Sequence, residues 1–247
     1  MTKSAKAAVY PSPGAPLNIN SYPLRPVNND EVLVQVTMAT ICRSDIHSYL
    51  GHRPNPCPGI LGHEIVGIIR EIGHHIQFDL RGEPLTLGDR VTWMEYYQKN
   101  PSFYADVMNL PQKAPNLKKY GHDLVTDEPH FNGGFGEYCY IMPGTGILKI
   151  PTVLSDAEAA PLNCGVATMA CVTEAAAIEL GDTVVIQGLG LLGIYGCAIA
   201  KSRGARKVIG IDSVSERLEL ARKFGADITL DLSALEEKDL IECVRSE

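Results

Sequence analysis

The chain has 247 residues, of which 45% are hydrophobic and 21% are charged, a composition typical of a globular protein that can form two domains. Its formal net charge of -7 argues against nucleic-acid binding, because a surface that binds phosphates carries an excess of Lys and Arg. The seven cysteines are odd in number and form no closely spaced framework. We therefore expect a cytoplasmic protein with reduced thiols.

The most apolar segment, residues 183–200, reads TVVIQGLGLLGIYGCAIA and does not predict a membrane span. Gln187 and four glycines interrupt it, whereas a spanning helix needs about 20 mostly apolar residues. The first residues, MTKSAKAAVYPSPG, contain no apolar run of signal-peptide length. We expect a buried strand followed by a buried helix, and no membrane insertion.

The first part of the chain predicts a β-rich domain over residues 1–155. Runs rich in β-branched residues, bounded by Gly and Pro turns, predict short strands at 31–40, 63–73, 88–93 and 136–142. No repeat period is present.

Residues 156–247 predict a second domain of alternating strands and helices. An alanine-rich helical stretch begins after Ser155, a plausible N-cap with Glu158 three residues on. The elements that follow are strands at 183–188, 207–212 and 227–232, and helices at 191–203, 215–225 and 236–245. This order predicts a parallel sheet covered by helices.

The segment QGLGLLG supplies the pattern G-x-G-x-x-G at Gly188, Gly190 and Gly193, between a predicted strand and a predicted helix. Such a turn lets a pyrophosphate approach the backbone at a helix N-terminus. Asp212 ends the next strand, where a carboxylate would accept hydrogen bonds from the adenosine ribose and repel a 2'-phosphate. This favours NAD over NADP, although the nearby Arg217 could accommodate a phosphate. A glycine turn in an unrelated α/β domain is the competing interpretation.

Several side chains of the first domain are candidates for a metal site. They are Cys42, Ser44, Asp45, His47, His63, Glu64 and Cys164. Thiolate and imidazole are ligands that zinc prefers, and a catalytic site uses three of them with a fourth position open. Spacing alone does not decide the matter, because isolated cysteines are often buried small hydrophobes and a lone histidine is often a loop residue. Cys57, six residues before His63, is a further possible ligand, although its neighbouring prolines favour a loop.

The motifs taken together resemble one family. CRSDIH, GILGHEIVG, GDRV and NCGVAT, followed by GLGLLG, occur in the order found in the zinc-dependent alcohol dehydrogenases of the medium-chain dehydrogenase/reductase superfamily. The resemblance covers nearly the whole chain. It implies an α/β plus β fold, with a GroES-like catalytic domain followed by a Rossmann domain whose second half is missing.

The resemblance implies one catalytic zinc ion. It places Cys42, His63 and Cys164 on the three ligands and Glu64 on a conditional ligand. Asp45 falls on the carboxylate that orients the histidine ligand, a role that fixes which ring nitrogen faces the metal.

The resemblance also implies a proton relay and contacts to NAD. Ser44 and His47 fall on the relay, which takes the proton of the alcohol and passes it to solvent. Arg43 falls on a residue that meets the pyrophosphate, and Thr168 on a position near the nicotinamide. His52, His74 and His75 are expected to face solvent without a role.

The chain departs from the family in two respects. Many members hold a second, structural zinc with four cysteines, but the corresponding positions are Asn100, Phe103, Asp106 and Ala114. We therefore expect no structural zinc, and a lobe held by Phe103, Tyr104 and Tyr120 or else mobile. A full member also continues well beyond Glu247, and the absent half of its sheet normally supplies the dimer contact. We expect a homo-oligomer whose partner covers the exposed sheet edge.

The sequence thus predicts an NAD-dependent zinc alcohol dehydrogenase that acts on a small alcohol or aldehyde. The words GEPLTLGDRVTW, LPQK and KYGH resemble the subgroup associated with phosphonate catabolism. Within the enzyme class, a polyol or amino-alcohol dehydrogenase of the same superfamily is the competing hypothesis. Two further hypotheses are a truncated, catalytically silent nucleotide-binding protein and a metal-free reductase of the quinone-reductase type. The three ligands speak against the metal-free reductase.

Overall fold

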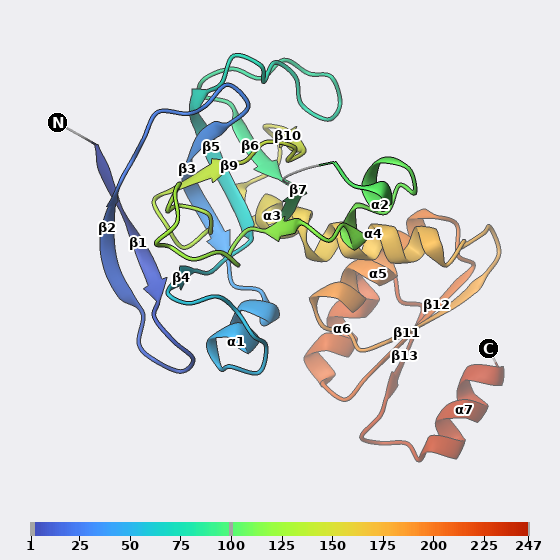
Figure 1. Cartoon of the computed structure of the whole chain (residues 1–247). Helices are drawn as coiled ribbons and strands as arrows, with labels where there is room; N and C mark the ends of the chain where they lie inside the picture. The colour runs from blue at the N-terminus through green and yellow to red at the C-terminus, as the bar shows by residue number, and fades with distance from the viewer. Residues whose placement is uncertain (1–2, 99–100, 247) are drawn as a thin grey trace. The chain divides into compact units, whose positions relative to one another are not determined.

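The computed structural model describes residues 3–98 and 101–246 (Figure 1). The chain divides into two compact units, Met1–Cys164 and Gly165–Glu247. The expected boundary at residue 155 precedes this division, because helix α3 (Asp156–Ala159) and the 3-10 helix η2 (Ala160–Asn163) pack against strands of the first unit. Ser155 caps α3 as predicted, and it forms a capping box with Glu158.

The first unit is built on antiparallel sheets. A three-stranded sheet has the order β2 (Asn18–Pro23), β1 (Ser4–Tyr10) and β4 (Gly59–Ile60). A five-stranded sheet has the order β10 (Ile147–Lys149), β6 (Arg90–Trp93), β5 (Glu64–Ile72), β3 (Val32–Thr40) and β9 (Tyr138–Ile141). The four predicted strands are therefore present, as β3, β5, β6 and β9.

The pairing of β3 with β5 sets the position of the candidate metal residues. The last pair of the ladder joins Thr40 to Glu64. Because the strands are antiparallel, the residues that follow β3 lie beside those that precede β5. Cys42 is thereby brought to His63, although they are far apart in sequence.

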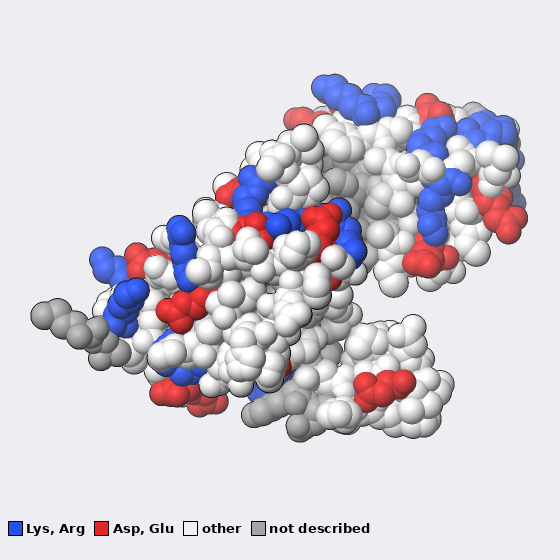
Figure 2. Space-filling view, turned by 90° about the horizontal axis from the view of Figure 1, so that it is seen from above, with Lys and Arg blue, Asp and Glu red and all other residues white. Residues whose placement is uncertain are grey.

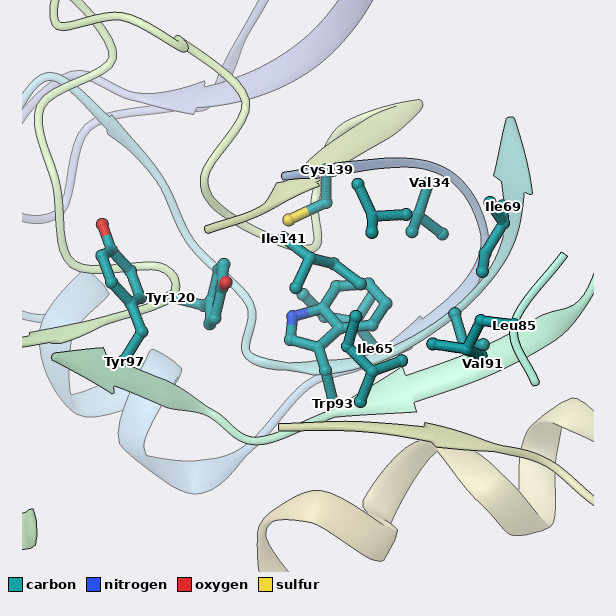
Figure 3. Close-up of a cluster of buried hydrophobic side chains, with 12 residues drawn as sticks. Val34, Ile65, Ile69, Leu85, Val91, Trp93, Tyr97, Tyr120, Cys139 and Ile141 are labelled. Atoms are coloured by element: carbon teal, nitrogen blue, oxygen red, sulfur yellow. The ribbon is translucent and has the colours of Figure 1, made fainter. Parts of the chain in front are cut away.

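The main core of the first unit lies around Trp93, which is 1% exposed (Figure 3). Ile65 and Ile141 lie against the indole, with Tyr97 and Tyr120 toward one end of the cluster. Trp93 and Tyr120 meet edge to face, with ring centroids 6.1 Å apart. A packed aromatic pair of this kind contributes to stability beyond its buried area.

We expect Trp93→Ala to lower the free energy of unfolding by about 3–5 kcal/mol, since it leaves a cavity in a fully buried cluster. Urea unfolding followed by circular dichroism measures this, because Trp93 is the only tryptophan and its fluorescence is lost. Val153→Ala, at a side chain 86% exposed, is the control and should change stability by less than about 0.5 kcal/mol. Equal stability of both variants would contradict the expected packing.

The lobe between β6 and β9 differs from the expectation. It contains strands β7 (Tyr96–Gln98) and β8 (Leu117–Lys119), helix α2 (Phe103–Asp106) and the 3-10 helix η1 (Pro111–Lys113). Tyr120 is fully buried, and its hydroxyl bonds Thr145 Oγ1 and the Met142 N–H. Phe103 and Tyr104 are 62% and 47% exposed, so their predicted anchoring role is wrong. The β7–β8 pairing joins the ends of the lobe instead. Asn100 lies outside the described residues.

The second unit contains a parallel sheet in the order β11 (Thr183–Gln187), β12 (Lys207–Asp212) and β13 (Ile228–Asp231). Its helices are α4 (Gly165–Ala175), α5 (Leu191–Ser202), α6 (Ser215–Lys223) and α7 (Glu237–Ser246). Helices α5 and α6 pack on the sheet and on each other (Figure 1). The predicted order of strands and helices is therefore present.

The apolar segment 183–200 divides into β11 and α5, as predicted. Across the described ranges, no helix has the length and apolar character needed to cross a membrane. On the face shown in Figure 2, Lys and Arg side chains lie among Asp and Glu side chains. This mixture agrees with the acidic net charge and does not form a broad basic surface on that face.

Candidate metal centre

Four side chains of the first unit converge on one point. Cys42, His63, Glu64 and Cys164 each offer a ligand atom, and these atoms all lie within 4.8 Å of one another. Cys42 precedes helix α1 (Arg43–Tyr49), and His63 directly precedes β5, of which Glu64 is the first residue. Cys164 follows η2. The cluster therefore combines three separate segments that the fold brings together.

His63 is fixed at both ring nitrogens. Its Nδ1 lies 3.2 Å from Asp45 Oδ1, and its Nε2 lies 3.5 Å from Cys164 Sγ. The Asp45 carboxylate also accepts the N–H groups of Cys42 at 2.9 Å and Gly62 at 3.2 Å. Since the Asp45 carboxylate lies beside Nδ1, Nε2 is the ring nitrogen that faces the cluster.

The Asn163 side chain links two backbone segments beside the cluster. Its Nδ2 donates to the carbonyl oxygens of His63 and Trp93, both at 2.8 Å. On the other side, the Thr40 hydroxyl donates to the Glu64 carboxylate. These contacts connect the ligand residues to the ends of β3, β5 and β6. The cluster is therefore held by regular structure and not by flexible loops alone.

The cluster favours a thiolate. A hydrogen bond from the Cys164 thiol, and then the contact with His63, lower the pKa of Cys42. The hydrogen bond to Cys42, together with burial, raises the pKa of Cys164. Burial by itself lowers the pKa of His63, but the contacts with Asp45 and Cys42 outweigh it and raise that pKa to about 9. Burial raises the pKa of Glu64.

These residues fit a zinc ion. Two thiols, one imidazole and a carboxylate are the donors that zinc prefers, and their mutual distances suit a tetrahedral site. The Cys164 Sγ to His63 Nε2 distance of 3.5 Å is that expected of two ligands on one ion. Protons that now bridge these atoms would be released when a metal binds.

We expect Asp45→Asn to weaken zinc binding by roughly 10- to 100-fold, because it removes the charged partner of His63 Nδ1. Competition with a chromophoric chelator measures this affinity. Asp30→Asn is the matched control, since Asp30 pairs with the exposed His75 at 2.8 Å in the same manner. Similar affinity in the wild type and Asp45→Asn would show that the carboxylate does not support the ligand.

The predicted relay residues lie on α1. Ser44 Oγ is 3.4 Å from His63 Nε2, so this hydroxyl reaches the cluster. His47 lies one helical turn after Ser44 on the same face, since residues three apart are neighbours on a helix. Its Nδ1 is 3.5 Å from Nδ1 of the exposed His52. Sequence reasoning gave His52 no role, and in the structure it is the side chain that contacts His47.

The glycine turn of the second unit has the geometry of a phosphate-binding loop. Gly188 has φ +89°, a conformation that favours glycine, and an added Cβ at Gly193 would lie 2.0 Å from Gly188 O. An added Cβ at Gly190 would meet nothing within 4 Å, so the turn is open on that side. Gly190 also caps α5, whose first N–H groups are therefore available to an anion.

Asp212 ends β12 beside this turn and is 6% exposed. Its carboxylate accepts the N–H groups of Leu189 at 2.7 Å, Ser213 at 2.8 Å and Val214 at 3.0 Å. Burial alone would raise its pKa, but these bonds outweigh burial and lower it. Arg217 lies 3.5 Å from the carboxylate. The negative charge of Asp212 is thus fixed next to the glycine turn.

The other two predicted cofactor contacts are exposed. Arg43 begins α1 of the first unit, and Thr168 lies on α4 of the second. Their contacts with a dinucleotide stay predictions.

Sequence reasoning missed a charged group beside the cluster. Glu95 Oε2 lies 3.8 Å from His63 Nε2 and 3.0 Å from Lys119 Nζ. The ring of His122 lies 6.3 Å from that of His63, and burial lowers its pKa. No spacing pattern marks these residues, and the contact between Glu95 and Lys119 depends on the β7–β8 pairing.

Comparison with known proteins agrees with this geometry. The model of the alcohol dehydrogenase GroES-like domain matches residues 28–152, and that of the zinc-binding dehydrogenase domain matches residues 192–246. The chain is 34% identical to a D-arabitol-phosphate dehydrogenase of Enterococcus avium, over 82% of the chain and 54% of that protein. It is 31% identical to an alcohol dehydrogenase of Geobacillus stearothermophilus, over 92% of the chain and 63% of that protein.

A solved alcohol dehydrogenase of Thermotoga maritima has a TM-score of 0.92 and 31% identity, over 99% of the chain and 67% of that structure. The chain therefore matches the zinc-binding dehydrogenases in fold and in family models. The chain belongs to the zinc-dependent alcohol dehydrogenases of the medium-chain dehydrogenase/reductase superfamily. The predicted fold class, a GroES-like domain followed by part of a Rossmann domain, is confirmed. The chain spans less than two thirds of the two curated relatives named above.

Proposed function

We propose that the protein is an NAD-dependent oxidoreductase that uses one zinc ion to transfer hydride between a small alcohol and the corresponding carbonyl compound. The cluster of Cys42, His63, Glu64 and Cys164 carries this proposal, because it joins zinc-preferring donors with a hydroxyl at 3.4 Å. The glycine turn with Asp212 supports a dinucleotide as the second substrate. We further propose a cytoplasmic homo-oligomer without a structural zinc.

The chain supplies the groups that such a reaction needs. When bound, zinc would act as a Lewis acid on the alcohol oxygen, and NAD would accept the hydride. Cys42, His63 and Cys164 hold the ion, and Asp45 keeps His63 in the tautomer that can bind it. Ser44 Oγ accepts the proton of the alcohol.

The proton leaves along α1. His47, three residues after Ser44 on α1, receives the proton. His52, whose Nδ1 lies 3.5 Å from that of His47, passes the proton to water. Histidine suits this position because it titrates near physiological pH. Glu64, whose pKa burial raises, is held by Thr40 within reach of the ion as a conditional ligand.

Asp212 favours NAD over NADP in this proposal. Its carboxylate is negative and fixed, so it can accept hydrogen bonds from ribose hydroxyls and would repel a 2'-phosphate. Solved relatives bind either form: one from Sinorhizobium meliloti, 26% identical, is bound to NADP, and one from Escherichia coli, 28% identical, is complexed with NADH. The pairing of Arg217 with Asp212 reduces the charge that Arg217 could offer to a phosphate.

The test is NADH formation by the zinc-loaded full chain with a panel of small alcohols. We expect turnover with NAD that is lost on removal of zinc, and much weaker turnover with NADP. Dinucleotide binding without oxidation of any alcohol would favour a catalytically silent nucleotide-binding protein. Turnover that persists after zinc removal would favour a metal-free reductase.

A further inference from the structure

Two histidine side chains that do not belong to the metal cluster face one another at the end of helix α1. His47 lies in the last turn of α1, and His52 follows the helix. Their Nδ1 atoms are 3.5 Å apart, and their ring centroids are 5.7 Å apart. Within residues 3–98 and 101–246, neither ring forms a hydrogen bond or an ion pair with any other side chain. The pair therefore has ring nitrogens to offer to a ligand.

The backbone at the end of α1 explains why the two rings meet. The His52 N–H donates to the His47 carbonyl oxygen at 2.9 Å, and the Gly51 N–H donates to that of Ser48 at 3.1 Å. Gly51 has φ +76°, in the left-handed region. This combination is the Schellman motif, in which the second residue past the helix cap commonly makes a hydrophobic contact with the last turn. In this chain two imidazoles take the place of that contact, so the backbone holds them together before any ligand binds.

The distance between the two nitrogens suits a metal ion. Zinc binds a histidine nitrogen at about 2.1 Å, so two nitrogens on one tetrahedral ion lie about 3.4 Å apart. The observed distance of 3.5 Å is close to this value. An ion bound there would replace the proton that the two Nδ1 atoms share.

The pair can hold an ion only weakly. Among the residues that the structure describes, no third His, Cys or carboxylate side chain joins it, whereas the cluster around His63 combines four such groups. Water would complete the coordination of the ion. We therefore expect an ion at this pair to exchange with the solution and to leave the chain when the buffer is exchanged.

We propose that His47 and His52 form a second metal site, which binds Zn²⁺ reversibly and inhibits the enzyme. The inhibition rests on the proposed function, in which both imidazoles carry the proton away from Ser44, whereas the binding does not. Zinc on the two Nδ1 atoms occupies the lone pairs that would accept this proton. Turnover therefore falls when zinc is present in excess of the ion held by the cluster.

The binding test is isothermal titration of Zn²⁺ into the full chain that already holds one equivalent of zinc, without dinucleotide. We expect one further ion per wild-type chain, bound more weakly than the first. His47→Gln and His52→Gln should each lower the affinity for this second ion by at least roughly 10-fold, the smallest loss expected even for a residue that only orients a ligand. His74→Gln is the matched control, because His74 and His75 form another exposed pair, with ring centroids 4.2 Å apart. It should keep the second ion.

The second measurement is the rate of NADH formation as zinc is added. The wild-type rate should fall with the dissociation constant of the second ion, whereas the remaining rate of His52→Gln should not respond over the same range. A tightly held first ion without a second one would overturn this inference alone, as would a second ion that both variants retain or that His74→Gln loses. A second ion that leaves the wild-type rate unchanged would overturn the inhibition. Absence of a tightly held first ion would overturn the proposed function instead.

Discussion

Cys42→Ser is expected to abolish zinc binding, whereas His47→Gln, in the same segment of the chain, is expected to leave it intact. In the proposed site Cys42 supplies a thiolate, so its loss would remove one of three ligands. The affinity for zinc should fall by more than roughly 100-fold, which is the largest loss expected when a residue that only orients a ligand, such as Asp45, is replaced. His47 contacts His52 instead, so its replacement should lower kcat by roughly 100-fold while zinc stays bound.

Zinc content of the two purified variants and their rates of NADH formation separate these roles. Circular dichroism shows whether Cys42→Ser retains the fold. Loss of zinc from His47→Gln would contradict the division between ligand and relay. So would a Cys42→Ser variant that keeps its zinc.

Gly190→Ala is expected to lower NAD affinity by at least about 10-fold while costing at most about 1 kcal/mol of stability, the cost of alanine at the N-cap of α5. Its φ of -68° suits any residue, and an added Cβ would meet no neighbour within 4 Å. The methyl group would instead occupy the surface that a pyrophosphate approaches. Isothermal titration with NAD and a thermal melt measure the two effects.

Gly193→Ala is the paired variant and should behave differently. Its Cβ would lie 2.0 Å from Gly188 O, a backbone atom that cannot move without opening the turn between β11 and α5. We expect a destabilisation of about 1–3 kcal/mol together with loss of NAD binding. Wild-type NAD affinity in Gly190→Ala would exclude this turn as the dinucleotide site.

The sequence predicted most of the regular structure because its strands and helices carry clear local patterns. The strand predicted at 31–40 is β3 (Val32–Thr40) in the structure, and the strand predicted at 207–212 is β12, with the same bounds. The strands β1 and β2 were not predicted individually. Segment β1 reads SAKAAVY, whose small residues alternate between buried and exposed positions with little hydrophobic contrast. Its place as a strand depends on pairing with β2 and β4.

The candidate site was predictable only in part. Cys42, His63 and Cys164 have no spacing that marks a metal site, and their grouping came from the resemblance of several motifs together. The β3–β5 register explains why Cys42 meets His63, and the packing of η2 against β5 brings Cys164 to them. Glu95 and Lys119 could not be found in this way, because their contact depends on the pairing of β7 with β8. The role predicted for Phe103 was wrong, since hydrophobic character alone does not tell which aromatic side chains become buried.

Cys42, His63 and Cys164 are proposed to hold one zinc ion. Native mass spectrometry of the zinc-loaded full chain, beside Cys164→Ala, tests it most directly. We predict one zinc ion per wild-type chain and none in Cys164→Ala. A wild-type chain without zinc would contradict the claim, as would a variant that retains the ion, and two ions per wild-type chain would contradict the expected absence of a structural zinc.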